Sequence, residues 1–250
     1  MLMTMTSAWI VLPAVLLAGA LIGASGIGGV LLVPVLTQLG AVPLPQAIAA
    51  ASLGFALPAL VALGPLRRER ALAARCVPLL AGALAGAAAG ALMLRWLPAG
   101  LLMSGVTALV LFAGWRGLMA ASNPAPASAA PLGTTALLAL GALVGLGSAL
   151  TGTGGPVLVI PLLMLLRQPL AFAVVAAQAI QLPVALASST VHAIEGRLDL
   201  SLALLCGVLM LAGSIAGQRA AALLDVRQMQ RMVSLLLLAV GAWFAWLLLA

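Results

Sequence analysis

The stretch Gly26-Ile27-Gly28-Gly29-Val30-Leu31-Leu32-Val33-Pro34 decides the fold, because a closely similar stretch occurs again about 126 residues later. The second copy is Gly152-Thr153-Gly154-Gly155-Pro156-Val157-Leu158-Val159-Ile160-Pro161. Later matches keep nearly the same spacing, for example Leu57-Pro58 with Leu182-Pro183, and Gly86 with Gly213. A duplicated apolar chain with a glycine-interrupted segment in each half is typical of secondary transporters that bind substrate between their repeats.

The composition excludes a water-soluble domain. Hydrophobic residues make up 65% of the chain, charged residues 6%, and the mean hydropathy is +1.29. Soluble domains carry about four times this density of charge. Helices satisfy their own backbone hydrogen bonds in lipid, so an all-α polytopic membrane protein is expected. The net charge of +7 comes from Arg, and we interpret it as an orientation signal in the bilayer rather than a nucleic-acid-binding surface.

The apolar segments divide the chain into two halves joined by a polar, proline-rich linker. We expect a first transmembrane repeat at 1–118, a linker at 119–132 and a second transmembrane repeat at 133–250. Each repeat has about five apolar segments, of which the first two form a glycine-broken hairpin or short pair and the other three span the membrane. The segments are 8–24, 28–39, 47–64, 76–94 and 100–116, then 134–150, 154–166, 172–191, 200–218 and 232–249.

The distribution of arginines predicts how the chain is threaded. As one helix, 8–39 would be about 48 Å long, well beyond a hydrocarbon core of about 30 Å. If the chain instead returns to its starting side at each glycine break, nine arginines lie in the cytoplasm and two, Arg95 and Arg197, lie outside. A single crossing gives the weaker division of six against five. The first arrangement predicts two inverted repeats related by a pseudo-two-fold axis, with both termini outside the cytoplasm.

Each glycine break is followed by the start of a new helix, which is where we expect the substrate. The first N–H groups of a helix have no partner within it, and its dipole favours an anion there. Nearby polar side chains add hydrogen bonds, although Ser and Thr also bond to their own helix and Gln also joins neighbouring helices. The predicted substrate-binding residues are Ser25, Gly26, Gly28, Gly29, Ser52, Thr151, Gly152, Thr153, Gly154, Gly155, Gln178 and Gln181.

The sequence offers few residues that could support ion coupling, metal binding or catalysis. No Asp or Glu falls within a predicted span, so neither a carboxylate proton relay nor a sodium cage is expected. His192 stands alone at the outer end of a segment, and we interpret it as a structural residue near the membrane surface. Cys76 and Cys206 occupy positions that are not equivalent in the two repeats, and we interpret both as packing residues. No metal, cofactor or ATP-binding motif occurs, and we expect neither a metal site nor a catalytic residue.

The two breaks resemble those of the TauE/SafE family, also called the sulfite exporter or TSUP family. The resemblance rests on Gly26-Ile27-Gly28-Gly29 with Pro34 and Gly152-Thr153-Gly154-Gly155 with Pro161, and it spans essentially the whole chain. It implies a transporter in the bacterial inner membrane for sulfite, sulfonates such as sulfoacetate, or other small sulfur-containing anions. Pro156 directly follows the second break where the first half has Val30, so the two halves are not identical at this point.

The main hypothesis is therefore an exporter of a small sulfur oxyanion. A negative charge that leaves a cell gains about 2.3 kcal/mol per 100 mV of inside-negative potential, which favours export without a coupling ion. One alternative is a passive anion channel of the same fold. Another is an intramembrane serine protease, since Gly23-Ala24-Ser25-Gly26 matches a rhomboid motif and His192 offers a base. The identity of the anion, the coupling ion and the oligomeric state stay open.

Overall fold

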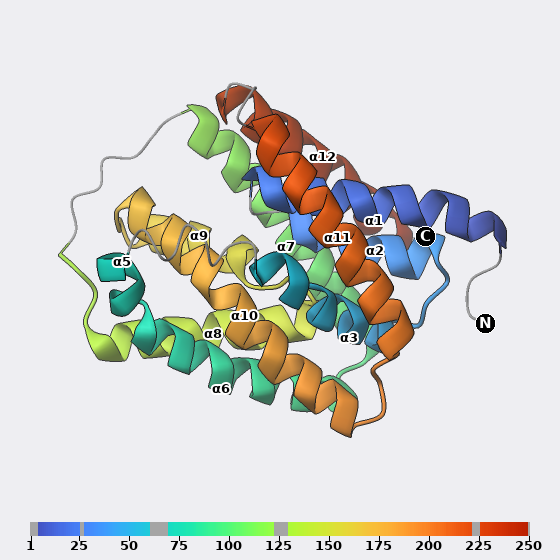
Figure 1. Ribbon diagram of the computed structural model, residues 1–250, viewed down its shortest axis with the longest axis horizontal. Coiled ribbons are helices and arrows are strands. Elements are labelled where there is room, and N and C mark those ends of the chain that lie inside the picture. The colour runs from blue at the N-terminus through green and yellow to red at the C-terminus, as the bar shows by residue number, and fades with distance from the viewer. Residues whose placement is uncertain (1–4, 26–27, 61–69, 123–129, 222–225, 250) are drawn as a thin grey trace.

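The computed structural model describes residues 5–25, 28–60, 70–122, 130–221 and 226–249, and every element in these ranges is helical (Figure 1). Helical residues 56–60 continue α3 beyond a turn at Phe55. The first half contains α1 (Met5–Ser25), η1 (Gly28–Leu31), α2 (Leu32–Pro34), η2 (Val35–Leu39), α3 (Leu44–Gly54), α5 (Arg70–Arg75), α6 (Val77–Met93), η3 (Leu94–Trp96) and α7 (Ala99–Ser122). The second half contains α8 (Thr134–Thr151), α9 (Pro156–Leu165), α10 (Leu170–Ile194), α11 (Leu200–Ala221) and α12 (Val226–Leu249).

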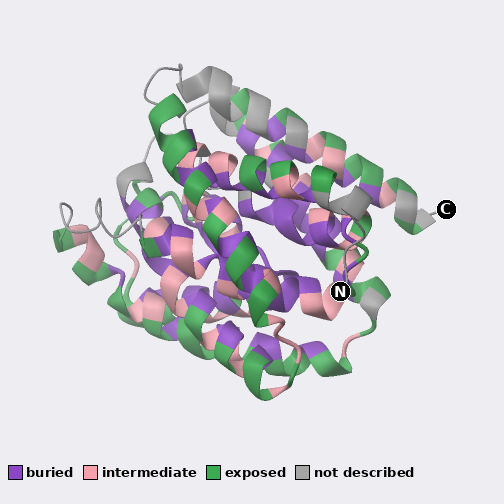
Figure 2. Ribbon diagram, turned by 45° about the vertical axis from the view of Figure 1, so that its right-hand side comes forward, coloured by how far each residue is buried: buried purple, intermediate pink, exposed green. Residues whose placement is uncertain are grey.

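The helices make a multi-pass membrane protein. Buried residues line the inward sides of the helices and exposed residues the outer sides (Figure 2). The outer surface is apolar: Trp9 and Ile194 are each 80% exposed, a situation that lipid favours and water does not. Five helical stretches of the described chain are long and apolar enough to cross a bilayer, namely Val77–Trp96, Gly100–Met119, Thr134–Thr151, Phe172–Ile194 and Leu200–Ala220.

Helices of one half of the chain pack mainly against helices of the other half. α6 of the first half lies along α8 of the second, α11 of the second half lies along α1 of the first, and α7 pairs with α12. Both of the first two pairs bring small residues together, which lets the helix backbones approach closely. The two halves therefore do not form separate bodies, and each completes the other's core.

The same exchange is visible at individual glycines. A Cβ added to Gly86 of α6 would collide with the carbonyl oxygen of Ala142 in α8. A Cβ added to Gly213 of α11 would collide with the carbonyl oxygen of Leu16 in α1. Gly213 follows Gly86 by 127 residues, and Ala142 follows Leu16 by 126, so the sequence offset also relates the two contacts. This reciprocity is the packing expected of two repeats, whose inverted arrangement in the bilayer stays a prediction.

The segments that follow the glycine breaks are short. α9 has 10 residues, which at 1.5 Å per residue is about 15 Å, or half the hydrocarbon thickness. A Cβ at Gly147 would lie 2.8 Å from a methyl group of Leu158, so the chain turns back after α8 instead of continuing straight. In the first half, 28–39 changes from a 3₁₀-helix to an α-helix to a π-helix. Arms of this length do not cross a bilayer alone, whereas α8 is long enough to do so, and the hairpin stays a prediction.

The helix boundaries agree with the apolar segments to within a few residues at most ends. α3 and α10 begin at equivalent prolines with nearly the same backbone geometry, φ −55° and ψ 137° at Pro43 and φ −56° and ψ 137° at Pro169. α7 continues to Ser122, within the predicted linker at 119–132. Residues 123–129 of that linker lie outside the described chain.

Candidate anion-binding site

The two glycine breaks meet inside the protein. A Cβ added to Gly29 would lie 3.3 Å from the carbonyl oxygen of Thr153, so the breaks lie next to each other with little room for a side chain between them. The ring of Phe55 covers both: it is 2.5 Å from the Cβ position of Gly29 and 3.1 Å from that of Gly154. Phe55 is 1% exposed. Two segments that are far apart in the sequence thus share one buried contact region.

Left-handed backbone shapes the second break. Gly152, Gly154 and Gly155 have φ values of 65°, 78° and 102°, which only glycine adopts without strain. The N–H of Gly152 donates to the carbonyl of Ser148 at 2.8 Å and ends α8. α9 then begins at Gly155 without a side-chain cap, which leaves the first N–H groups of that helix free of partners within it.

Three hydroxyl groups form a chain beside this break. The Thr151 hydroxyl donates to the carbonyl oxygen of Gly147 at 2.7 Å. The contact of 3.0 Å between Thr151 Oγ1 and Thr153 Oγ1 must then use the proton of Thr153. Ser148 Oγ lies 3.5 Å from Thr153 Oγ1 and is the remaining donor. All three side chains are buried, and an anion at the break would turn the Thr153 and Ser148 protons toward itself at little cost.

Ser52 lies on the side of α3 that faces the second break. Ile48 and Phe55 of the same face contact Gly152 and Gly154 respectively. Ser52 is four residues after Ile48 and three before Phe55, so its side chain belongs to that face. Ser52 is 5% exposed. The structure therefore brings Ser52 to the region that the sequence predicted for it.

The first break is described in part. Ser25 is the last residue of α1, and Gly28 is the first residue of η1. Gly26 lies outside the described residues. Gly28 and Gly29 begin the arm of the first half, as the sequence predicted, and Gly29 supplies the contact with the second break.

The two glutamines of α10 are less closely associated with the breaks. The contact from Gly155 to α10 is made by Ile180, 2.8 Å from the Cβ position of the glycine. Gln178 is half-buried and precedes Ile180 by two residues, and residues two apart on a helix do not share a face. Gln181 is 5% exposed, and its Nε2 donates to the carbonyl of Ala177 at 3.4 Å. The structure thus groups the glycines and hydroxyls, and Ile180 is the residue of α10 that contacts Gly155.

Comparison with known families agrees with this geometry. A family model described as sulfite exporter TauE/SafE matches residues 6–244, which is nearly the whole chain and includes both breaks. This chain belongs to the TauE/SafE family. No curated protein and no solved structure matches it.

Membership in the TauE/SafE family decides the broad function. The protein is a sulfite-exporter-type transporter of a small anion in a membrane. It is not an enzyme, so the intramembrane protease is excluded. The two breaks that carry the resemblance to TauE/SafE proteins are the segments that meet at Gly29 and Thr153.

Sequence reasoning about this TauE/SafE protein missed three features. Ser148 belongs to the hydroxyl chain, and its place one turn before Thr151 was the available signal. Phe55 covers both breaks, which no local pattern indicates. His192 lies in the last turn of α10, where the sequence placed it, and its side chain is fully buried, which the sequence did not indicate. The chain turns at Gly196 directly after this helix.

Proposed function

We propose that this TauE/SafE protein exports small sulfur-containing anions, such as sulfite and sulfoacetate, across a bacterial inner membrane. The anion would bind where the two glycine breaks meet. The observation that carries the proposal is the contact between Gly29 and Thr153, beside a buried chain of hydroxyl groups. Thr153 and Ser148 supply hydroxyl donors from the second half beside the point where Gly29 of the first half approaches.

The proposed site holds the anion without a charged side chain. The start of α9 presents backbone N–H groups and the positive end of a helix dipole. Pro156 has no N–H, so Gly155 and Val157 are the nearest backbone donors on that helix. Thr153 and Ser148 add hydroxyl donors that rotate toward the ligand. A neutral site of this kind binds an anion yet releases it readily, as a transporter requires.

The negative charge of the substrate supports export as the direction of transport. A divalent anion that leaves a cell at an inside-negative potential of 100 mV gains about 4.6 kcal/mol, twice the value for one charge. The described carboxylates, Glu195 and Asp199, lie in the loop between α10 and α11. No buried Asp or Glu within the described chain offers a proton or sodium site, which supports export driven by the membrane potential alone.

The two repeats would be 1–118 and 133–250, with inverted topology. The exchanged packing of α6 on α8 and of α11 on α1 supports this arrangement. The short arms after each break support re-entrant hairpins that approach the site from opposite faces of the bilayer. Alternating access would then be a movement of one repeat against the other around the anion.

Flux measurements in proteoliposomes test the proposal. Uptake of sulfite, sulfoacetate, thiosulfate and sulfate is followed under an imposed potassium-diffusion potential, with and without a pH gradient. We expect saturable flux of at least one sulfur oxyanion that follows the potential. Gly154→Val should abolish it, whereas Gly105→Ala, which has nothing within 4 Å of the added methyl, should leave it unchanged.

The same assay separates the rival functions. Flux that rises linearly with concentration and never saturates would replace the exporter by a passive anion channel. Flux that needs a pH gradient would contradict the potential-driven mechanism while leaving the substrate class in place. Absence of flux for all four anions, with folded protein, would reject the substrate class.

A further inference from the structure

We propose that the end of α10 forms a second anion site, built from Ser189, His192 and Arg197, through which the transported oxyanion passes on its way out. The inference rests on the proposed function, because it assigns a second binding site to the same class of substrate. The site is separate from the glycine breaks, since it is formed by the last turns of α10 and the loop that follows.

The end of α10 holds Arg197 against His192. The N–H of Arg197 donates to the carbonyl of His192 at 2.9 Å, and the N–H of Gly196 donates to the carbonyl of Ala193 at 3.1 Å. With Gly196 at φ 68°, these bonds define a Schellman motif, in which the residue after the glycine packs against the residue that accepts its N–H. Arg197 also acts electrostatically on His192. Ser189 is three residues before His192 and shares its helix face.

Several hydrogen-bonding atoms here are buried without a partner among the described residues. They are Ser189 Oγ, both ring nitrogens of His192, and Nε and Nη1 of Arg197. His192 is 0% exposed, Ser189 is 5% exposed, and the Arg197 side chain is 14% exposed. Buried polar groups almost always have partners, and a buried guanidinium with unused donors is especially costly. A missing ligand accounts for all of these groups together.

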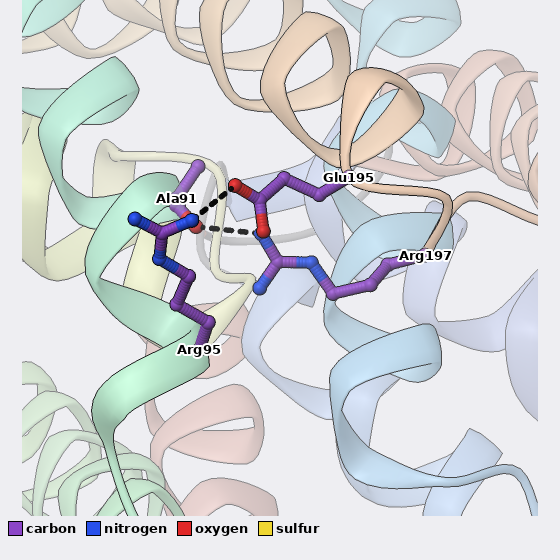
Figure 3. A network of polar contacts seen from close by, with 4 residues as sticks. All are labelled: Ala91, Arg95, Glu195 and Arg197. Atoms are coloured by element: carbon purple, nitrogen blue, oxygen red, sulfur yellow. Dashed lines mark hydrogen bonds and ion pairs between the residues drawn. The ribbon is translucent and has the colours of Figure 1, made fainter.

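The hydrogen-bonding atoms without partners specify the kind of ligand. Glu195 is shared by two arginines, with Oε1 3.4 Å from Arg95 Nη1 and Oε2 3.3 Å from Arg197 Nη2 (Figure 3). The nearby carboxylate of Asp199 is occupied in accepting the N–H of Leu202 at 3.0 Å. Both carboxylates are therefore engaged, and the groups without partners are predominantly donors. A small oxyanion supplies the missing acceptors.

The remaining contacts keep the guanidinium in place for such a ligand. Arg197 Nη2 also donates to the carbonyl oxygen of Ala91 at 3.0 Å, which ties the loop to α6 (Figure 3). Arg197 is thus anchored through one nitrogen while the other two stay unused. The arginine distribution puts Arg95 and Arg197 on the extracytoplasmic side, and the structure brings both to one carboxylate. A binding site at the extracytoplasmic end of α10 lies where the anion would leave an exporter.

Binding stoichiometry tests the second site. Equilibrium dialysis of radiolabelled sulfite against the purified full-length protein in nanodiscs should give two bound anions per chain. Arg197→Gln should reduce this to one. Arg95→Gln is the matched control, because Arg95 contacts the same carboxylate but is 51% exposed, and it should leave two. Ser189→Ala should weaken the outer site about tenfold without unfolding the protein, as expected for a lost hydrogen bond to a charged ligand.

The outcomes separate this inference from the central site. Binding of one anion by the unaltered protein, or of two anions by Arg197→Gln, would contradict the second site. The buried donors would then be hydrogen-bonded to ordered water. Should Arg197→Gln fail to fold, an affinity unchanged by Ser189→Ala would overturn it as well. If Arg197-dependent binding persists in a protein that shows no flux, the transport proposal fails and the site stands.

Discussion

Gly29 lies against the carbonyl oxygen of Thr153, with 3.3 Å between that oxygen and the position of an added Cβ. The two residues belong to different halves of the chain, and each lies in a glycine break. Any side chain at position 29 would also meet the ring of Phe55, at 2.5 Å. The approach of the two breaks therefore depends on the absence of a side chain at Gly29.

Gly29→Ala should lower both stability and flux, because Phe55 has to move to accommodate the methyl group. Overpacking of this kind costs about 1–3 kcal/mol. A smaller partner should relieve it, so Phe55→Leu added to Gly29→Ala should restore part of the lost melting temperature in detergent. If the double variant is no more stable than the two single changes predict together, the contact between Gly29 and Phe55 is not the cause.

Gly154→Ala should destabilise the protein through its backbone. The φ of 78° at this position lies in the left-handed region, where a Cβ costs about 1–2 kcal/mol. Gly105→Ala makes the same chemical change within α7 with nothing within 4 Å, and it should be neutral or slightly stabilising. Thermal unfolding monitored by size-exclusion chromatography compares the two. Equal melting temperatures would contradict the strained geometry of the second break.

Thr153→Val should weaken anion binding more than it weakens the fold. The change keeps the shape of the side chain but removes the hydroxyl that links Ser148 to Thr151. A hydrogen bond to a charged ligand contributes about 1.5–3 kcal/mol, so the KM for the transported anion should rise at least tenfold. Thr107→Val is the control, because its buried hydroxyl bonds to the carbonyl of Met103 within its own helix, α7. A similar KM for both variants would remove Thr153 from the site.

The sequence predicts the fold well where the signal is local or repeated. Apolar segments and glycine breaks indicate the helices and their duplication, and the distribution of arginines groups Arg95 with Arg197, which the structure places beside Glu195. The site is only partly predictable. Phe55 covers the breaks because of how α3 packs, and packing between distant segments leaves no local pattern. His192 is fully buried in the last turn of α10, which periodicity does not reveal.

Gly86→Ala should separate α6 from α8 and destabilise the protein. The added methyl would meet the backbone of Ala142, which cannot move aside as a flexible side chain would. Gly213→Ala makes the equivalent change against Leu16 of α1 and should have an effect of similar size. Melting temperatures of the two variants in the same detergent test this reciprocity. A loss confined to one of them would show that the two exchanged helix pairs are not equivalent in energy.

The native cysteines allow the threading of the second half to be measured with little background. Cys76 and Cys206 are free and buried. Because a maleimide must reach the thiol to react with it, both buried cysteines should label slowly at pH 7.5 in the folded protein and rapidly after unfolding.

Thr134→Cys and Ser201→Cys then report the two ends of the stretch from α8 to α10, since both residues are exposed. If the chain turns back at the second break, α10 alone carries it across, and the two positions face opposite sides. A membrane-impermeant maleimide added to intact cells should label Ser201→Cys and not Thr134→Cys until the membrane is opened. Labelling of both from one side would mean that α8 and α9 together make a full crossing, because α10 would then return the chain to the side on which Thr134 lies.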